Sequence, residues 1–153
     1  VLPADVPEWA KLAPDVTDIV AIAAAAVDAG ADALSLVNTT LGMAIDHTTL
    51  RPRLGGVTGG LSGPAIRPLA VRCVYQVAAA LPQVPLVGIG GIRTGEDALE
   101  FLAAGASAVQ LGTVLFHDPS APTRVAAELE AAIARVGATG VDEVVRAAHR
   151  RTP

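Results

Sequence analysis

The chain has 153 residues, of which 52% are apolar and only 3% aromatic, so it is long enough for one domain with an aliphatic core. A formal net charge of −4 without basic clusters argues against nucleic acid as a partner. No apolar run reaches the roughly 18 residues that a membrane-spanning helix needs, and nothing in the opening residues indicates export. The single cysteine, Cys73, excludes an internal disulfide and is typical of a reducing compartment, so we expect a cytoplasmic protein.

Short apolar runs alternate with helical patterns along the first part of the chain. We expect a strand over Trp9–Leu12, then a helix capped by Asp15, then a strand over residues 33–37. A long glycine-rich connection follows over residues 41–63, and we expect its inner part, residues 44–54, to form a small hairpin. The pattern indicates two β/α units, the second of which is interrupted by this connection.

The remainder of the chain continues the same alternation of strands and helices. The expected elements are a helix over residues 64–81, a strand over Leu86–Ile89, a helix capped by Thr94 over residues 95–104, a strand over residues 108–111, and helices near residues 122–135 and 141–148. Gly30 and Gly105 each end a helix just before a strand, so one β/α unit is echoed by another.

Four β/α units are therefore visible, whereas a closed (β/α)8 barrel needs eight units and about 250 residues. We expect an α/β fold that is the C-terminal half, strands 5 to 8, of a TIM barrel, with residues 1–153 forming one partial domain. The first residue is Val1 rather than methionine, which we likewise interpret as an indication that the chain is part of a longer protein. The alternative is a complete open α/β domain of four units.

Two neighbouring strands end on bare backbone, at Gly90-Gly91 and at Gly112-Thr113. Glycine lets backbone N–H groups approach a ligand closely, and in TIM barrels the loops after strands 7 and 8 form a phosphate site. The pair therefore predicts a phosphate site. The alternative is that both segments are tight turns without a ligand.

Polar residues close the two earlier strands. Lys11 is the only lysine beside ten arginines, and it stands near the end of its strand; the alternative to a functional role is a side chain that simply reaches solvent. Asn38 and Thr39 follow the next strand, and an amide offers both a hydrogen-bond donor and an acceptor to a ligand. The alternative for Asn38 is a residue that only forms the turn after its strand.

These segments occur in one order at the spacing of barrel units. They are Lys11-Leu12-Ala13-Pro14, Leu36-Val37-Asn38-Thr39, Thr58-Gly59-Gly60-Leu61-Ser62-Gly63-Pro64, Gly88-Ile89-Gly90-Gly91-Ile92 and Leu111-Gly112-Thr113. Over residues 10–119 the chain resembles the C-terminal half of dihydroorotate dehydrogenase, a flavin barrel enzyme of pyrimidine synthesis. Residues 41–46 and 65–68 look most like the class 1, NAD-linked catalytic subunit.

The resemblance implies FMN as the cofactor and oxidation of dihydroorotate to orotate as the reaction. It implies that FMN is bound by Lys11, Val37, Gly63, Gly90, Gly91, Gly112 and Thr113, and that the substrate is bound by Asn38 and Thr39. Lys11 would meet the pyrimidine edge of the flavin, and the two glycine turns would hold its phosphate. The catalytic base of class 1 enzymes lies in the other half of the barrel, so we expect no catalytic base here and little turnover from the isolated chain.

The resemblance also implies a second subunit that carries FAD and a [2Fe–2S] cluster, and we expect an oligomer of like or unlike subunits. The electron acceptor is left open between NAD, fumarate and others. Two alternatives remain for the function: a related flavin barrel such as the reductase domain of dihydropyrimidine dehydrogenase, or a non-catalytic half-barrel that only binds phosphate ligands. A sugar-phosphate barrel without flavin fits Lys11 and Asn38-Thr39 poorly.

We expect the single cysteine and the three histidines to have structural rather than catalytic or metal-binding roles. Cys73 falls near the buried side of its helix, where a free cysteine usually acts as a small apolar residue. His47, His117 and His149 have no mutual spacing that predicts a metal site, so we expect surface or loop positions and no metal.

Overall fold

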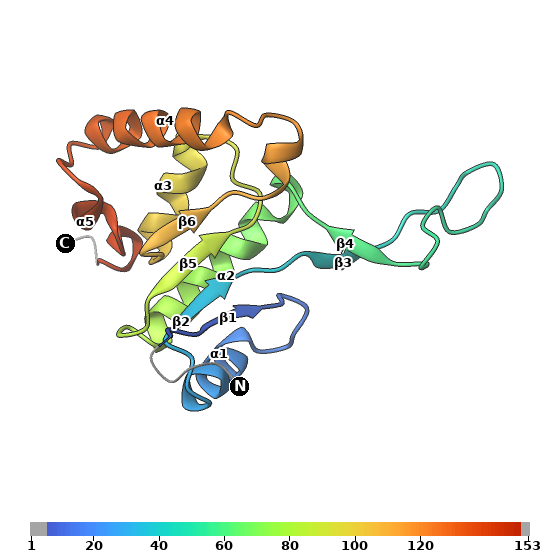
Figure 1. Ribbon diagram of the computed structural model, residues 1–153, viewed down its shortest axis with the longest axis horizontal. Coiled ribbons are helices and arrows are strands. Elements are labelled where there is room, and N and C mark those ends of the chain that lie inside the picture. The colour runs from blue at the N-terminus through green and yellow to red at the C-terminus, as the bar shows by residue number, and fades with distance from the viewer. Residues whose placement is uncertain (1–5, 151–153) are drawn as a thin grey trace.

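A parallel sheet of four strands organises the chain (Figure 1). The computed structural model describes residues 6–150. The strands are β1 (Trp9–Leu12), β2 (Ala33–Leu36), β5 (Leu86–Ile89) and β6 (Ala108–Gln110), and they lie in the order β1-β2-β5-β6. Each strand pairs with the parallel strand that comes before or after it along the chain. The strand order therefore does not reverse, as it does in doubly wound sheets.

Helices connect the strands and pack beside one another. They are α1 (Ile19–Asp28), α2 (Arg67–Ala80), α3 (Gly95–Ala104), α4 (Ala121–Arg135) and the short α5 (Val141–Val144), with 3₁₀ turns η1 (Pro64–Ile66), η2 (Thr113–Phe116) and η3 (Ala147–His149). Helix α2 packs against both α1 and α3, and α3 packs against α4. None of the helices that the structure describes is long and apolar enough to cross a membrane.

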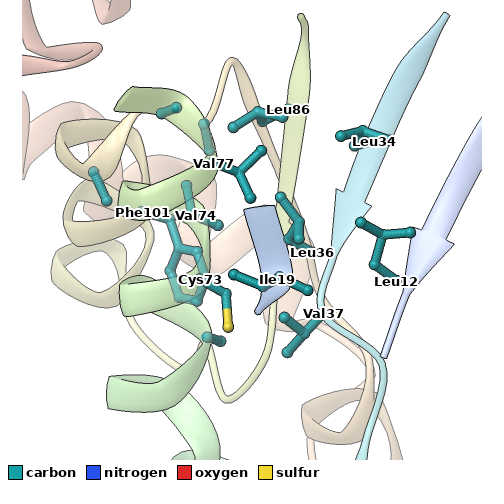
Figure 2. Close-up of a cluster of buried hydrophobic side chains, with 14 of the residues drawn as sticks. Leu12, Ile19, Leu34, Leu36, Val37, Cys73, Val74, Val77, Leu86 and Phe101 are labelled. Carbon is teal, nitrogen blue, oxygen red and sulfur yellow. The ribbon is translucent and has the colours of Figure 1, made fainter. Parts of the chain in front are cut away.

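The hydrophobic core lies between the sheet and these helices (Figure 2). Leu34 and Leu36 of β2 face Val74 and Val77 of α2, and all four are fully buried. Cys73 is buried in the same layer, as its place on the helix predicts, and burial raises the pKa of its thiol. The thiol therefore stays protonated and serves as packing.

The face of the sheet opposite the helices is exposed at its two outer strands, β1 and β6. Because side chains alternate along a strand, Ser35 lies on the other side from Leu34 and Leu36, in register with Lys11 of β1. On this face Trp9 is 64% exposed, and Ala108 and Gln110 of β6 are also exposed. Within residues 6–150 the outer edges of β1 and β6 pair with no strand. A parallel sheet is normally covered on both faces, so this one has room for further structure.

A hairpin arm projects from the sheet between β2 and α2 (Figure 1). Its strands β3 (Thr40–Gly42) and β4 (Gly59–Leu61) pair antiparallel, and beyond them a single bridge joins Ile45 to Pro52. The predicted hairpin over residues 44–54 is therefore the tip of a longer one. The arm carries large apolar side chains that are exposed, namely Leu41, Met43, Ile45, Leu50, Leu54, Val57 and Leu61.

The first helix begins three residues later than predicted. Asp18, not Asp15, is the N-cap, and its carboxylate accepts hydrogen bonds from the backbone N–H groups of Val20 (2.9 Å) and Ala21 (3.2 Å). Asp15 instead accepts hydrogen bonds from the Thr40 hydroxyl and from the backbone N–H of Leu41 (2.9 Å). The predicted cap residue therefore anchors the base of the hairpin arm.

Replacing Asp18 with alanine should lower the free energy of unfolding by about 1 kcal/mol, because two N–H groups at the start of α1 lose their acceptor. Asp18→Asn should lower the free energy of unfolding much less, because the amide oxygen can still accept hydrogen bonds from the same N–H groups. Urea unfolding followed by circular dichroism measures both. An equal loss in the two variants would contradict the capping role.

The C-terminal helical region also differs from the prediction. The expected helix over residues 141–148 is broken at Arg146, which adopts a left-handed φ of 61°. The guanidinium of Arg146 donates hydrogen bonds to the carbonyls of Pro82 (2.7 Å) and Ala78. His149 is half-buried rather than a surface residue: its ring stacks on Tyr75 with centroids 4.1 Å apart, and its Nε2 lies 2.9 Å from the Ala104 carbonyl oxygen.

Candidate functional site

A pocket of about 450 Å³ lies at the carboxyl ends of the four parallel strands. Parallel β/α proteins bind their ligands at this edge, because the loops that follow the strands converge there. The lining residues come from every strand end and from the segment after the hairpin arm: Lys11, Val37, Asn38, Thr39, Ser62, Gly63, Pro64, Ile66, Ile89, Gly90, Gly91, Ile92, Arg93, Gln110, Gly112, Thr113, Val114 and His117.

All nine residues singled out from the sequence line this one pocket. They are Lys11, Val37, Asn38, Thr39, Gly63, Gly90, Gly91, Gly112 and Thr113. They are spread over more than a hundred positions of the chain, and it is the parallel pairing of β1, β2, β5 and β6 that brings them together. The pocket therefore offers a cation, an amide, hydroxyls and bare backbone to one ligand.

The backbone requires glycine at some positions of the pocket, whereas packing does not require it at others. Gly90 and Gly91 have positive φ values of 141° and 78°, and a Cβ on Gly91 would lie 2.6 Å from the carbonyl oxygen of Gly63. The fold itself therefore requires both. At Gly112 φ is −122°, and a Cβ would meet nothing closer than Ile89 Cδ1 at 3.9 Å. Packing does not explain glycine at position 112, where a Cβ would fill space beside the pocket.

The hydroxyl of Thr113 is already engaged. It donates a hydrogen bond to the hydroxyl of Ser62 at 2.8 Å, which joins the turn after β6 to the segment after β4. Ser62 therefore belongs to the pocket together with Thr113. The sequence places Ser62 inside the glycine-rich motif 58–64, but nothing local to that motif indicates its partner 51 residues away.

Backbone hydrogen bonds fix the polar strand ends of β1 and β2. The Asn38 N–H donates to the Leu12 carbonyl (2.8 Å), and the Val37 N–H donates to the Ile89 carbonyl (2.7 Å). Val37 is buried, whereas Asn38, Thr39 and Lys11 are exposed. The backbone here is held on both sides while three polar side chains remain accessible to a ligand.

The turn after β5 is held by the buried carboxylate of Asp97. Its Oδ2 accepts hydrogen bonds from the N–H groups of Arg93 (2.8 Å) and Thr94 (3.1 Å), and its Oδ1 is ion-paired with Arg67. The Thr94 hydroxyl accepts from the Asp97 N–H (3.2 Å) in return, which completes a capping box and confirms Thr94 as the cap of α3. The glycine turn thus ends in a fixed structure rather than a flexible loop.

Sequence reasoning missed several lining residues besides Ser62. Arg93 and His117 line the pocket and also an adjoining polar hollow of about 360 Å³, which Thr94, Val114, Asp118 and Arg124 complete. Their only sequence signal is that each follows a glycine turn by a few positions. Gln110 could have been found by alternation along β6, since it is in register with Ile89 of β5. His117 is an exposed residue after η2, as expected, but it lies at the pocket.

The fold and the pocket define a parallel β/α protein whose ligand site lies at the strand carboxyl ends. The family profile of dihydroorotate dehydrogenase matches residues 3–133. The chain belongs to the dihydroorotate dehydrogenase family.

Curated relatives and a solved structure agree with this membership. The catalytic subunit of dihydroorotate dehydrogenase B (NAD(+)) from Geobacter metallireducens is 57% identical over 141 residues, covering 92% of this chain and 46% of the relative. The subunit of the same name from Citrifermentans bemidjiense is 62% identical over 124 residues, covering 81% of this chain and 40% of the relative. The chain spans about half the length of the curated relatives it matches.

Among solved structures, dihydroorotate dehydrogenase from Eimeria tenella, determined in complex with ferulenol, matches with a TM-score of 0.79 and 34% identity. The match covers 94% of this chain and 38% of that one. Almost all of the chain therefore adopts the backbone arrangement of one portion of a larger family member.

Proposed function

We propose that the protein carrying this chain oxidises dihydroorotate to orotate with FMN as cofactor, in pyrimidine biosynthesis. The observation that supports this most directly is the single pocket of about 450 Å³ lined by Lys11, by Asn38-Thr39 and by both glycine turns. All of these positions lie within residues 3–133, the range that the family profile matches.

We also propose that residues 1–153 form strands 5 to 8 of a (β/α)8 barrel. The sequential strand order, the open edges of β1 and β6, and the exposure of Trp9 on the uncovered face all favour a half-barrel over a complete open domain. An open sheet of four strands would leave that face against solvent, which parallel sheets rarely do.

The residues present fit FMN. Gly112 leaves space that a Cβ would fill, and no atom lies within 4 Å of a Cβ built on Gly63, so backbone can approach a large ligand at both positions. We assign the FMN phosphate to Gly90, Gly91, Gly112 and Thr113, where backbone N–H groups suit an anion. FMN supplies a hydride acceptor for the oxidation when it is bound.

The side chains at the other end of the pocket have separate roles in this proposal. Lys11 would supply a positive charge to the bound flavin, and a cation there would stabilise the negative charge of the reduced cofactor. Val37, Gly63, Asn38 and Thr39 line the same pocket. In this proposal Val37 and Gly63 would pack against the cofactor, and Asn38 and Thr39 would hydrogen-bond the pyrimidine substrate. The base that removes the substrate proton is not among these residues and is assigned to the other half of the barrel.

The names of the relatives also support a proposal about partners. Several relatives are named catalytic subunits of an NAD(+)-dependent enzyme, so we propose that this protein passes electrons to a second subunit that carries FAD and a [2Fe–2S] cluster. We further propose a cytosolic location, which a single unpaired cysteine in a chain of 153 residues favours.

The test is to purify the complete protein that carries these residues and examine it for bound flavin. We expect flavin absorbance, release of FMN on denaturation, and bleaching of the flavin by dihydroorotate under anaerobic conditions. Bleaching by dihydrouracil instead would indicate a dihydropyrimidine dehydrogenase-like enzyme. A colourless protein that binds inorganic phosphate and no flavin would overturn the proposal in favour of a phosphate-binding half-barrel.

A further inference from the structure

The two glycine turns need something to hold them at a fixed spacing. The ladder between β5 and β6 ends at the pair Ile89 and Gln110, just before the turns begin. In the part of the chain that the structure describes, no backbone hydrogen bond joins residues 90–95 to residues 111–118. A phosphate that is bound by both turns would therefore depend on side chains to keep them in register.

The guanidinium of Arg124, in the first turn of α4, connects the two turns. Its Nη1 donates a hydrogen bond to the Arg93 carbonyl (3.2 Å), which belongs to the turn after β5. Its Nε and Nη2 both donate to Oδ2 of Asp118, at 3.1 and 2.9 Å, in the loop after β6. The Asp118 N–H in turn donates to the carbonyl of Val114 (2.8 Å), inside the 3₁₀ turn that begins at Thr113.

Glu128 completes this connection from the next turn of α4. Its Oε1 accepts from Arg124 Nη1 (2.8 Å), and its Oε2 accepts from the Gly95 N–H (2.9 Å) at the start of α3. The approach is close, because a Cβ on Gly95 would lie 2.2 Å from the carbonyl carbon of Glu128. Hydrogen bonds from Arg124 and the Gly95 N–H lower the pKa of Glu128, and bonds from Ser120 and Arg124 lower that of Asp118, so both stay ionised at neutral pH.

We propose that Arg124 is a positioning residue for the flavin phosphate: it sets the spacing of the two glycine turns so that their N–H groups converge on one anion. The inference rests on the proposed FMN function. Arg124 does not line the main pocket, so it acts through the backbone carbonyl of Arg93 and through Asp118. The planar guanidinium holds its donors in a fixed fork that reaches three acceptors spread around it, a geometry that the compact ammonium of lysine does not reproduce.

The test compares Arg124→Gln and Arg124→Lys with the original residue, in the complete protein, by titrating FMN and riboflavin. We expect FMN affinity to fall about tenfold or more in both variants, which corresponds to about 1.4 kcal/mol of binding free energy, while riboflavin affinity stays unchanged. Arg135→Gln is the matched control, because Arg135 is another arginine of α4 with an acidic partner, Glu96 of α3, but that pair is exposed and lies outside both hollows.

A second measurement does not need the cofactor. Hydrogen exchange of the flavin-free protein should be faster in peptides covering residues 90–95 and 112–118 in both Arg124 variants, and unchanged in Arg135→Gln. Restoration of FMN affinity by lysine would show that charge alone matters and would overturn the inference, as would equal losses for FMN and riboflavin. If the original protein binds no FMN, the proposed function fails, whereas unchanged exchange and an unchanged FMN-to-riboflavin ratio in the variants would refute only the role of Arg124.

Discussion

Gly112→Ala is expected to weaken FMN binding by about tenfold to a hundredfold while lowering the midpoint of thermal unfolding less than Gly91→Ala does. A hydrogen bond to a charged group contributes about 1.5 to 3 kcal/mol, and a methyl group beside the Gly112 and Thr113 N–H groups would keep the phosphate from reaching them. Packing around the turn leaves room for the methyl group, because the nearest atom to the new Cβ is 3.9 Å away, whereas a Cβ on Gly91 would lie 2.6 Å from a carbonyl oxygen. Fluorescence titration of FMN and differential scanning calorimetry provide the two measurements.

Two other glycines serve as references for this variant. Gly140 has an extended backbone, with φ at −165°, and no atom within 4 Å of a built Cβ, so Gly140→Ala should change neither property. Gly91→Ala should lower stability and FMN affinity together, because its Cβ would collide with the Gly63 carbonyl. Undiminished FMN affinity in Gly112→Ala would show that the phosphate does not lie at this turn.

Lys11→Met should slow reduction of bound FMN by dihydroorotate by about a hundredfold to a thousandfold, the size of effect seen when one group that stabilises developing negative charge is removed. Methionine keeps a flexible apolar stem of similar length but removes the charge. The same change should lower the midpoint potential of the flavin, since the reduced, anionic form loses its cation. Anaerobic stopped-flow reduction and a redox titration measure the two effects.

Lys11→Arg is the corresponding conservative variant. It retains the charge and should restore most of the midpoint potential, even if its bulkier head slows the reaction. A wild-type rate and potential in Lys11→Met would mean that Lys11, although it lines the pocket, only reaches solvent.

The strands could be predicted because each is a short apolar run that ends in a turn signal. β1 and β5 have the predicted bounds, and β2 and β6 end one residue earlier than predicted. Parallel pairing then forces the strand ends to one edge, so the gathering of Lys11, Asn38 and the glycine turns follows from the fold class alone. Thr94 could be predicted as a cap because its partner, Asp97, is only three residues away.

The features that could not be predicted depend on partners that are distant in sequence. Asp15 and Asp18 are equally suitable caps by residue type, and the choice is made by Thr40 and Leu41, which bind Asp15 from 25 and 26 residues away. The left-handed conformation of Arg146 is likewise coupled to carbonyls more than sixty residues away. Local patterns contain no information about such contacts.

The same limit applies to the network around Arg124. An Arg at the start of a helix with an acid four residues later predicts only an ordinary pair along the helix surface. Its additional bonds to Arg93 and Asp118 exist because the fold brings the first turn of α4 beside both turns, which the spacing of residues in the sequence does not reveal.

The position of the hairpin arm has a consequence for how this chain can change. The arm lies between β2 and α2, so the lysine and amide end of the pocket is encoded before it and the two glycine turns after it. Its tip is exposed and projects away from the sheet (Figure 1). Insertions or deletions at the tip can therefore alter what the protein meets at its surface without shifting the register of β2 against β5, and the two ends of the pocket can diverge independently of the arm.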